Sequence, residues 1–108
     1  MFVTVPDDTD PGSAVAWVRE DEGTTLVLGQ SDADRRGLGY DVVTAMITLG
    51  AHSALDAVGL TAAVSGALAA EGIACNVLAG YHHDHLFVPA DRAEQALALL
   101  EALSVRSG

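Results

Sequence analysis

The densest cluster of chemically active side chains is the run His82-His83-Asp84-His85, and one further histidine lies at His52. Imidazole and carboxylate groups are ligands of zinc, which takes three or four of them in a tetrahedral arrangement. Neighbouring residues in a strand point to opposite faces, so only alternate members of the run can converge on one ion. Because the chain also lacks an HExxH pattern and paired cysteines, we expect a polar hairpin turn here and no metal site.

Two residues, Ser53 and Cys75, are candidate nucleophiles for covalent catalysis. A nucleophile needs a base and an orienting acid, and neither Ser53 nor Ser65 lies in a G-x-S-x-G turn. Cys75 lies between Ala74 and Asn76 in a predicted strand, where a cysteine usually behaves as a small hydrophobic residue. No G-x-G-x-x-G or Walker pattern occurs. The sequence therefore predicts a protein without catalytic residues and without a cofactor.

One backbone feature predicts binding of a small anionic group. The loop from His52 to Val58 leads into Gly59-Leu60-Thr61, at the predicted start of a helix. The first N–H groups of a helix have no partner within the helix and lie at the positive end of its dipole. Such an end binds carboxylates and phosphates, and Gly59 has no Cβ to hinder a ligand. The alternative is that Gly59 only allows a tight turn.

The second half of the chain predicts the order strand, helix, strand, strand, helix. The strands are expected at 42–49, 73–80 and 85–88, the first of them buried on both faces because few polar residues interrupt it. The helices are expected at 59–71 and after Pro89. This order is the core of a split β-α-β, or ferredoxin-like, sandwich: an α+β fold with an antiparallel sheet and helices on one face.

The two predicted helices carry terminal signals. Gly72 stands where a left-handed C-terminal cap belongs, and Ile73 follows in the position of its hydrophobic contact. Asp91 is the expected N-cap of the last helix, with Glu94 completing a capping box. In the first helix, apolar residues recur at helical spacing, which predicts one buried stripe: Leu60, Ala63, Val64, Ala67 and Leu68. The opposite face carries small side chains that would let another backbone approach.

The first half predicts strands at 2–5, 14–19 and 24–28, with a turn at 20–23. A short helix is expected to follow from Ser31, whose hydroxyl suits an N-cap. The chain has 108 residues, one cysteine and a formal net charge of −10. Such an acidic surface repels nucleic acid and anionic lipid, and no apolar run is long enough to span a bilayer. A single cysteine fits a reducing compartment, so we expect a cytoplasmic protein.

The second half resembles the ACT-domain superfamily, and more narrowly a branch of small stand-alone bacterial proteins of unassigned function. The most specific part runs from Cys75-Asn76-Val77 through Gly80-Tyr81 to the segment 83–89, His-Asp-His-Leu-Phe-Val-Pro. The segment 53–64 and the stretches 19–23 and 25–28 also match, so the likeness covers nearly the whole chain.

This resemblance implies two ACT-like halves in tandem, an incomplete one at 1–44 and a second at 45–108, packed as one compact domain. ACT domains commonly pair side by side and bind an amino acid or similar metabolite. Their ligand usually meets the loop entering the first helix and the following strand. Carried over to this chain, the expected ligand-binding residues are Ser53, Val58, Gly59, Leu60, Thr61, Cys75, Asn76 and Val77. Asn76 suits a zwitterion, since its amide both donates and accepts hydrogen bonds, and it equally suits a solvated strand edge.

One departure from the family pattern concerns the N-terminus, where relatives usually carry a helix before the strand at 2–5. Without it the first sheet is expected to expose Phe2, Val15, Trp17 and Leu26. A bare apolar patch predicts association or a truncated gene start, and we expect a homodimer. Two functions follow: a regulatory module that binds an amino-acid-like molecule, or a structural, protein-interaction unit with the same architecture and no ligand.

Overall fold

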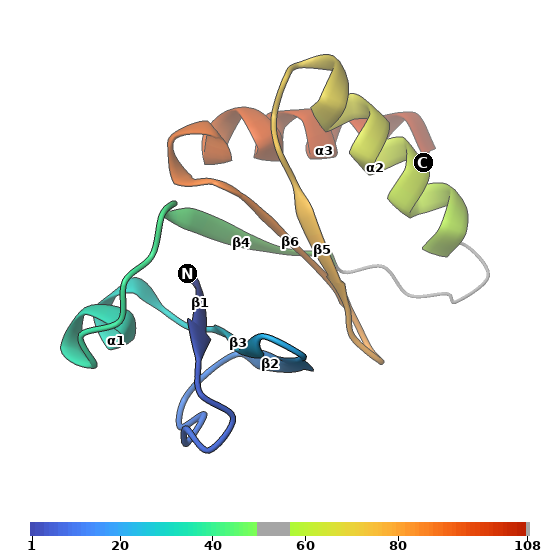
Figure 1. The fold of residues 1–108 in the computed structure, drawn as a ribbon. Helices are drawn as coiled ribbons and strands as arrows, with labels where there is room; N and C mark the ends of the chain where they lie inside the picture. The colour runs from blue at the N-terminus through green and yellow to red at the C-terminus, as the bar shows by residue number, and fades with distance from the viewer. Residues whose placement is uncertain (50–56, 108) are drawn as a thin grey trace. The chain divides into compact units, whose positions relative to one another are not determined.

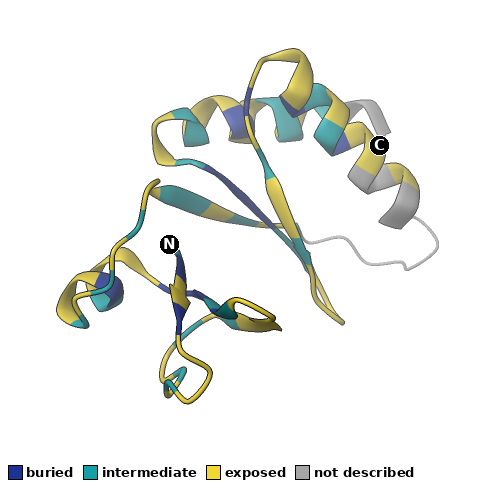
Figure 2. Cartoon of the chain, in the orientation of Figure 1, coloured by how far each residue is buried: buried dark blue, intermediate teal, exposed yellow. Residues whose placement is uncertain are grey.

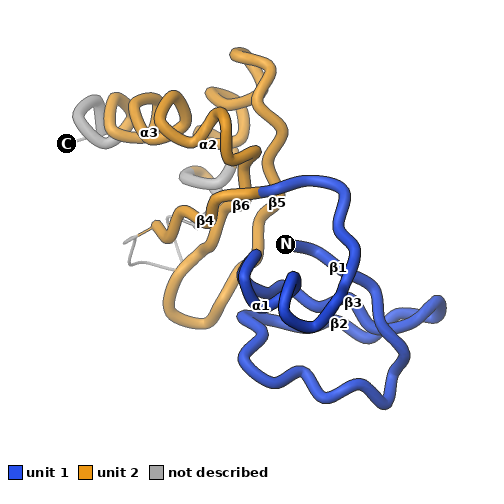
Figure 3. Tube along the Cα trace, turned by 90° about the vertical axis from the view of Figure 1, so that its left-hand side faces the viewer, with its two compact units in different colours: residues 1–43 blue, residues 44–108 orange. Residues whose placement is uncertain are grey.

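The structure is a computed structural model that describes residues 1–49 and 57–107, and the chain divides into two compact units (Figure 3). Unit 1 comprises residues 1–43 and unit 2 residues 44–108. Each unit contains a three-stranded antiparallel sheet and a separate cluster of buried hydrophobic residues. The fold is therefore α+β, as two ferredoxin-like halves in tandem.

Unit 1 consists of β1 (Phe2–Val5), β2 (Ala16–Glu20), β3 (Gly23–Val27) and α1 (Gln30–Arg35), with β3 in the middle of the sheet. A two-residue turn joins β2 to β3, because Glu20 pairs with Gly23. Gly23 has φ +140°, and a Cβ there would lie 2.9 Å from the carbonyl oxygen of Val5. Only glycine fits this close approach of β1.

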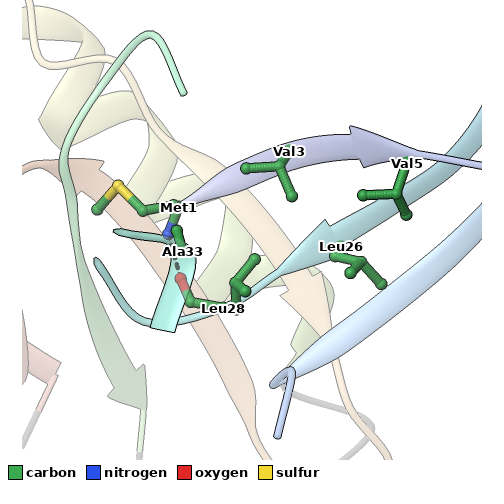
Figure 4. Packing of buried hydrophobic residues seen from close by; sticks show 6 residues of the cluster. All are labelled: Met1, Val3, Val5, Leu26, Leu28 and Ala33. Carbon is green, nitrogen blue, oxygen red and sulfur yellow. Dashed lines mark hydrogen bonds between the residues drawn. The ribbon is translucent and has the colours of Figure 1, made fainter. Parts of the chain in front are cut away.

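The core of unit 1 consists of side chains in or next to β1 and β3 together with Ala33 of α1 (Figure 4). Alternate residues of β1 and β3 point the same way, so the apolar residues at every second position form one buried layer. Its members are Met1, Val3, Val5, Leu26, Leu28 and Ala33. Leu26, predicted to be exposed, is only 1% exposed because its side chain belongs to this buried layer, and Phe2 is half-buried. Val15 and Trp17 are exposed, as predicted.

Unit 2 has the predicted order: β4 (Thr44–Leu49), α2 (Ala57–Ala70), β5 (Asn76–Ala79), β6 (Asp84–Pro89), a 3₁₀ turn η1 (Ala90–Arg92) and α3 (Ala93–Ser107). The sheet order is β4-β6-β5, and both helices lie on the same side of it (Figure 1). Val64 and Leu68 of α2 and Ala96 of α3 pack against Leu86 and Val88 of β6.

The C-terminus of α2 is capped as the sequence predicts. Gly72 adopts φ +68°, its N–H donates to the carbonyl of Ala69, and the N–H of Ile73 donates to the carbonyl of Leu68. This pair of bonds is the Schellman motif. Ile73 and Leu68 also belong to the same buried cluster, so the hydrophobic contact of the motif is present.

Four predictions about strand burial and helix starts were wrong. β4 is an edge strand and alternates between half-buried and exposed residues, so it is not buried on both faces. The helix α2 begins at Ala57, two residues earlier than predicted, and ends at Ala70. Ser31 does not cap α1, since that helix begins at Gln30 with Gly29 as its N-cap. Asp91 lies inside the 3₁₀ turn, whose N-cap is Pro89, two residues before the predicted cap.

Within residues 1–49 and 57–107, no helix is both long and apolar enough to cross a bilayer.

Candidate functional site

The start of α2 carries four of the eight predicted ligand-binding positions. Gly59 is the third residue of the helix, so its N–H is among the four that have no partner within the helix. Gly59 is exposed, and a Cβ built on it would meet no described atom within 4 Å. For Val58, Leu60 and Thr61 the structure describes the helical backbone, and Ser53 lies outside the described residues.

The strand positions Asn76 and Val77 lie on opposite faces of the sheet of unit 2. Val77 pairs with Leu86, a member of the buried cluster beneath α2 and α3. Asn76 pairs with Phe87, the next residue of β6, so its side chain points away from the helices. The sheet therefore separates the Asn76 amide from the side on which α2 lies, and a single chain does not bring Asn76 together with Gly59.

Cys75 immediately precedes β5 and packs against the helix-side cluster. Burial raises the pKa of its thiol, and a hydrogen bond from the backbone of Phe87 opposes this effect more weakly. The sulfur atom lies 3.7 Å from the carbonyl oxygen of Asn76. A thiol with a raised pKa stays protonated at neutral pH, so Cys75 is not an activated nucleophile.

The histidine run lies at the hairpin between β5 and β6, as the sequence predicts. Tyr81, His82 and His83 are exposed at its tip, and the rings of Tyr81 and His82 meet edge to face. His85 lies on β6, where its Nδ1 is 3.0 Å from Oγ1 of Thr48. In the described part of the chain, no three His, Cys, Asp or Glu residues are placed to hold a metal ion.

Unit 1 contains a hollow that sequence reasoning missed, with a volume of about 310 Å³. It lies between the loop that precedes β2 and the helix α1. Its lining residues are Asp10, Gly12, Ser13, Asp32, Arg35 and Arg36. The adjacent arginines and the Asp-Pro-Gly turn are visible in the sequence, but only the packing of the loop on α1 brings them together.

Hydrogen bonds across this hollow fasten the loop to α1. Arg36 Nη2 donates to the carbonyl oxygen of Asp10 at 2.7 Å, and Ser13 Oγ donates to Asp32 Oδ2 at 2.7 Å. Arg35 forms an ion pair with Asp32. The hydrogen bond from the Ser13 hydroxyl lowers the pKa of Asp32, and the hydrogen bond and charge of Arg35 lower it further. Because the polar groups largely bond one another, the arrangement fits a structural clasp better than a ligand site.

Comparisons with known proteins place the chain in a family. One model described as an ACT domain matches residues 41–102, and a second ACT-domain model matches residues 1–45. No curated protein matches. A crystal structure of a Vibrio cholerae protein of unknown function, described as a possible transport protein, is 44% identical with a TM-score of 0.84. That similarity covers 94% of this chain and 80% of the Vibrio chain. Since the first family model spans more than half of its residues, this chain belongs to the ACT-domain family.

Proposed function

We propose that this protein is a non-catalytic regulatory module that binds a small, amino-acid-like molecule. The observation that carries the proposal is the match of ACT-domain models to both halves of the chain. ACT domains are commonly regulatory modules that bind small ligands. The raised pKa of the Cys75 thiol supports a role without covalent catalysis.

The start of α2 supplies the physical basis for binding. The positive end of a 14-residue helix attracts a carboxylate, and Gly59, which is exposed there, has no Cβ to hinder one. The proposed ligand-contacting positions are Ser53, Val58, Gly59, Leu60, Thr61, Cys75, Asn76 and Val77. Asn76 points to the other side of its sheet from α2. A ligand that contacts both the Asn76 amide and the start of α2 therefore requires two copies of the chain. The module is accordingly proposed to work as a homodimer.

A thermal-shift screen against the twenty amino acids and the common nucleobases tests this function. A ligand that binds only the native state raises stability by about 2.7 kcal/mol at a concentration of 100 Kd. For a domain of this size, that corresponds to an increase in Tm on the order of 10 °C.

Two variants of α2 locate the site. Gly59→Val should abolish the shift, because the new side chain occupies the space beside the free N–H groups. Gly66→Ala is the matched control, because Gly66 is also exposed but lies in the middle of the helix. In this variant the ligand-induced increase in Tm should persist. A shift that survives Gly59→Val would place the ligand elsewhere.

The second candidate is a structural, protein-interaction unit with no ligand. The observation that favours it is the exposure of large apolar side chains on and beside β2, namely Val15, Trp17 and Val18. This function predicts no thermal shift with any small molecule, together with a specific protein partner.

A further inference from the structure

The tip of the hairpin between β5 and β6 carries two exposed imidazole rings that the proposed ligand site does not use. The N–H of Gly80 donates to the carbonyl oxygen of His83 at 2.9 Å, so Tyr81 and His82 are the two residues of a tight turn. Tyr81 is 98% exposed, and His82 and His83 are exposed beside it (Figure 2). The side chains of this tip are therefore accessible to a dissolved ion.

The turn changes how the histidine side chains are directed. Neighbouring side chains point to opposite faces only where the chain is an extended strand. The strand β6 begins at Asp84, so His82 lies in the turn and His83 lies between the turn and the strand. The ring centroids of His82 and His83 are 6.5 Å apart, and the ring planes are inclined at 52°. The alternation that argues against a metal site within a strand therefore does not separate these two rings.

The spacing of the two rings suits a shared metal ion. An imidazole nitrogen binds zinc at about 2 Å, which places the ion about 3 Å from the centre of each ring. The centres of two rings on one ion are accordingly about 5–6.5 Å apart, depending on the angle at the ion. The observed separation lies at the upper end of this range, and a small rotation of either exposed side chain shortens it.

The surroundings of the turn fix its shape and orient one of the rings. Gly80 is required, because a Cβ there would lie 2.8 Å from the carbonyl oxygen of His83. The rings of Tyr81 and His82 meet edge to face with 5.0 Å between their centroids. Because this contact is favourable, it limits the orientations of the His82 ring. The formal net charge of −10 also raises the concentration of cations near the surface.

The next two residues, Asp84 and His85, do not join this pair. Asp84 lies two residues before Leu86 on β6, so its side chain is on the helix side of the sheet. His85 is on the other face, where its Nδ1 lies 3.0 Å from Oγ1 of Thr48. Among residues 1–49 and 57–107, no three His, Cys, Asp or Glu side chains could share an ion. The tip therefore offers two ligands, and the other coordination positions are open to water.

We propose that the imidazoles of His82 and His83 form a two-ligand surface site for a divalent transition-metal ion. Imidazole suits zinc, nickel and copper, whereas magnesium and calcium prefer oxygen ligands. Among these ions copper(II) binds such donors most tightly. Because two positions come from the protein and the rest stay open, the ion is exchangeable rather than structural. Neither histidine is among the residues proposed to contact the amino-acid-like ligand, so this inference is independent of the proposed function.

Titration calorimetry with nickel(II) and with zinc(II) tests the site. The protein is untagged, metal-free and carries Cys75→Ser, which removes the thiol as a competing ligand. One ion should bind per chain. Loss of a group that merely supports a metal ligand costs about 10–100-fold in affinity, so His82→Ala and His83→Ala should each weaken binding at least about tenfold. Asp84→Asn is the matched control, and its affinity should equal that of the parent protein.

Electron paramagnetic resonance of bound copper(II) identifies the ligands directly. Two imidazole nitrogens should produce a hyperfine pattern that changes to that of one nitrogen in His82→Ala. Circular dichroism should stay native in both histidine variants, because these side chains are exposed. Unchanged affinity in the variant that lacks both histidines would overturn the proposal. Weaker binding in only one of the two single variants, or in Asp84→Asn alone, would overturn it as well.

Discussion

At the scale of single residues, backbone conformation decides what several positions tolerate. Gly72 holds the left-handed conformation that lets Ile73 return to the core, whereas Gly66 lies in the middle of α2 with open space around it. The fold therefore requires the glycine just after the end of α2, whereas the glycine inside the helix only costs helix propensity.

Substituting these two glycines by alanine should change stability in opposite directions. Gly72→Ala should lower the free energy of unfolding by about 1–2 kcal/mol, because an L-residue is strained in this conformation. Gly66→Ala should raise it by roughly 0.5–1 kcal/mol. Urea denaturation monitored by circular dichroism measures both. Equal effects of the two changes would contradict the role assigned to Gly72.

The clasp between α1 and the loop that precedes β2 has a predictable pH dependence. The pKa of Asp32 is lowered in the folded state, chiefly by the Ser13 hydroxyl and then by Arg35. The stabilisation is therefore fully present above the unfolded-state pKa, and it is lost as the pH falls through the folded-state pKa. Ser13→Ala should raise the pKa of Asp32, measured by NMR titration of its carboxyl carbon. An unchanged titration would show that the hydroxyl does not stabilise the carboxylate.

At the scale of elements, the two helices of unit 2 are anchored by a few side chains. Val64 and Leu68 of α2 are buried, whereas Ala62, Gly66, Ala69 and Ala70 face solvent. Ala63, predicted within the buried stripe, is exposed, and so is Leu97 of α3. Burial of the helix therefore depends on the few large residues rather than on its overall apolar composition.

Substituting leucine by alanine should lower the free energy of unfolding much more at a buried position than at an exposed one. Leu68→Ala should destabilise the protein by about 2–5 kcal/mol, because it removes a buried side chain and leaves a cavity. Leu97→Ala, the matched control on α3, should cost less than about 1 kcal/mol, since much of that side chain is already in water. Thermal and urea unfolding provide the comparison. A similar loss at both positions would show that Leu97 is covered in solution.

At the scale of the whole molecule, charge opposes association. Each copy carries a formal net charge of −10, so two copies repel each other at long range. Salt screens this repulsion, with a Debye length of about 10 Å at 0.1 M ionic strength. The proposed dimer should therefore be tighter at 0.3 M than at 0.02 M sodium chloride, as measured by sedimentation equilibrium. Tighter association at low salt would indicate an interface held by charge pairs between the copies.

Local signals were sufficient for much of the fold. The strand at Phe2–Val5, the turn before Gly23, the cap at Gly72 and the order of elements in unit 2 follow from residue types and spacing. Helix starts were less predictable, because Ser31 and Asp91 are good caps that lie one or more residues inside the observed turns. Cap preference is worth only about 1 kcal/mol, and the path of the preceding chain outweighs it.

By itself, the sequence determined the family, the acidic charge and the arrangement of elements in unit 2, because patterns of apolar residues and turn residues act locally. Only the tertiary structure decided that β4 is an edge strand, that Leu26 is buried, that Asn76 points away from α2, and that distant polar residues form the clasp. These properties depend on strand order, register and helix placement, which are set by contacts between residues far apart in the chain.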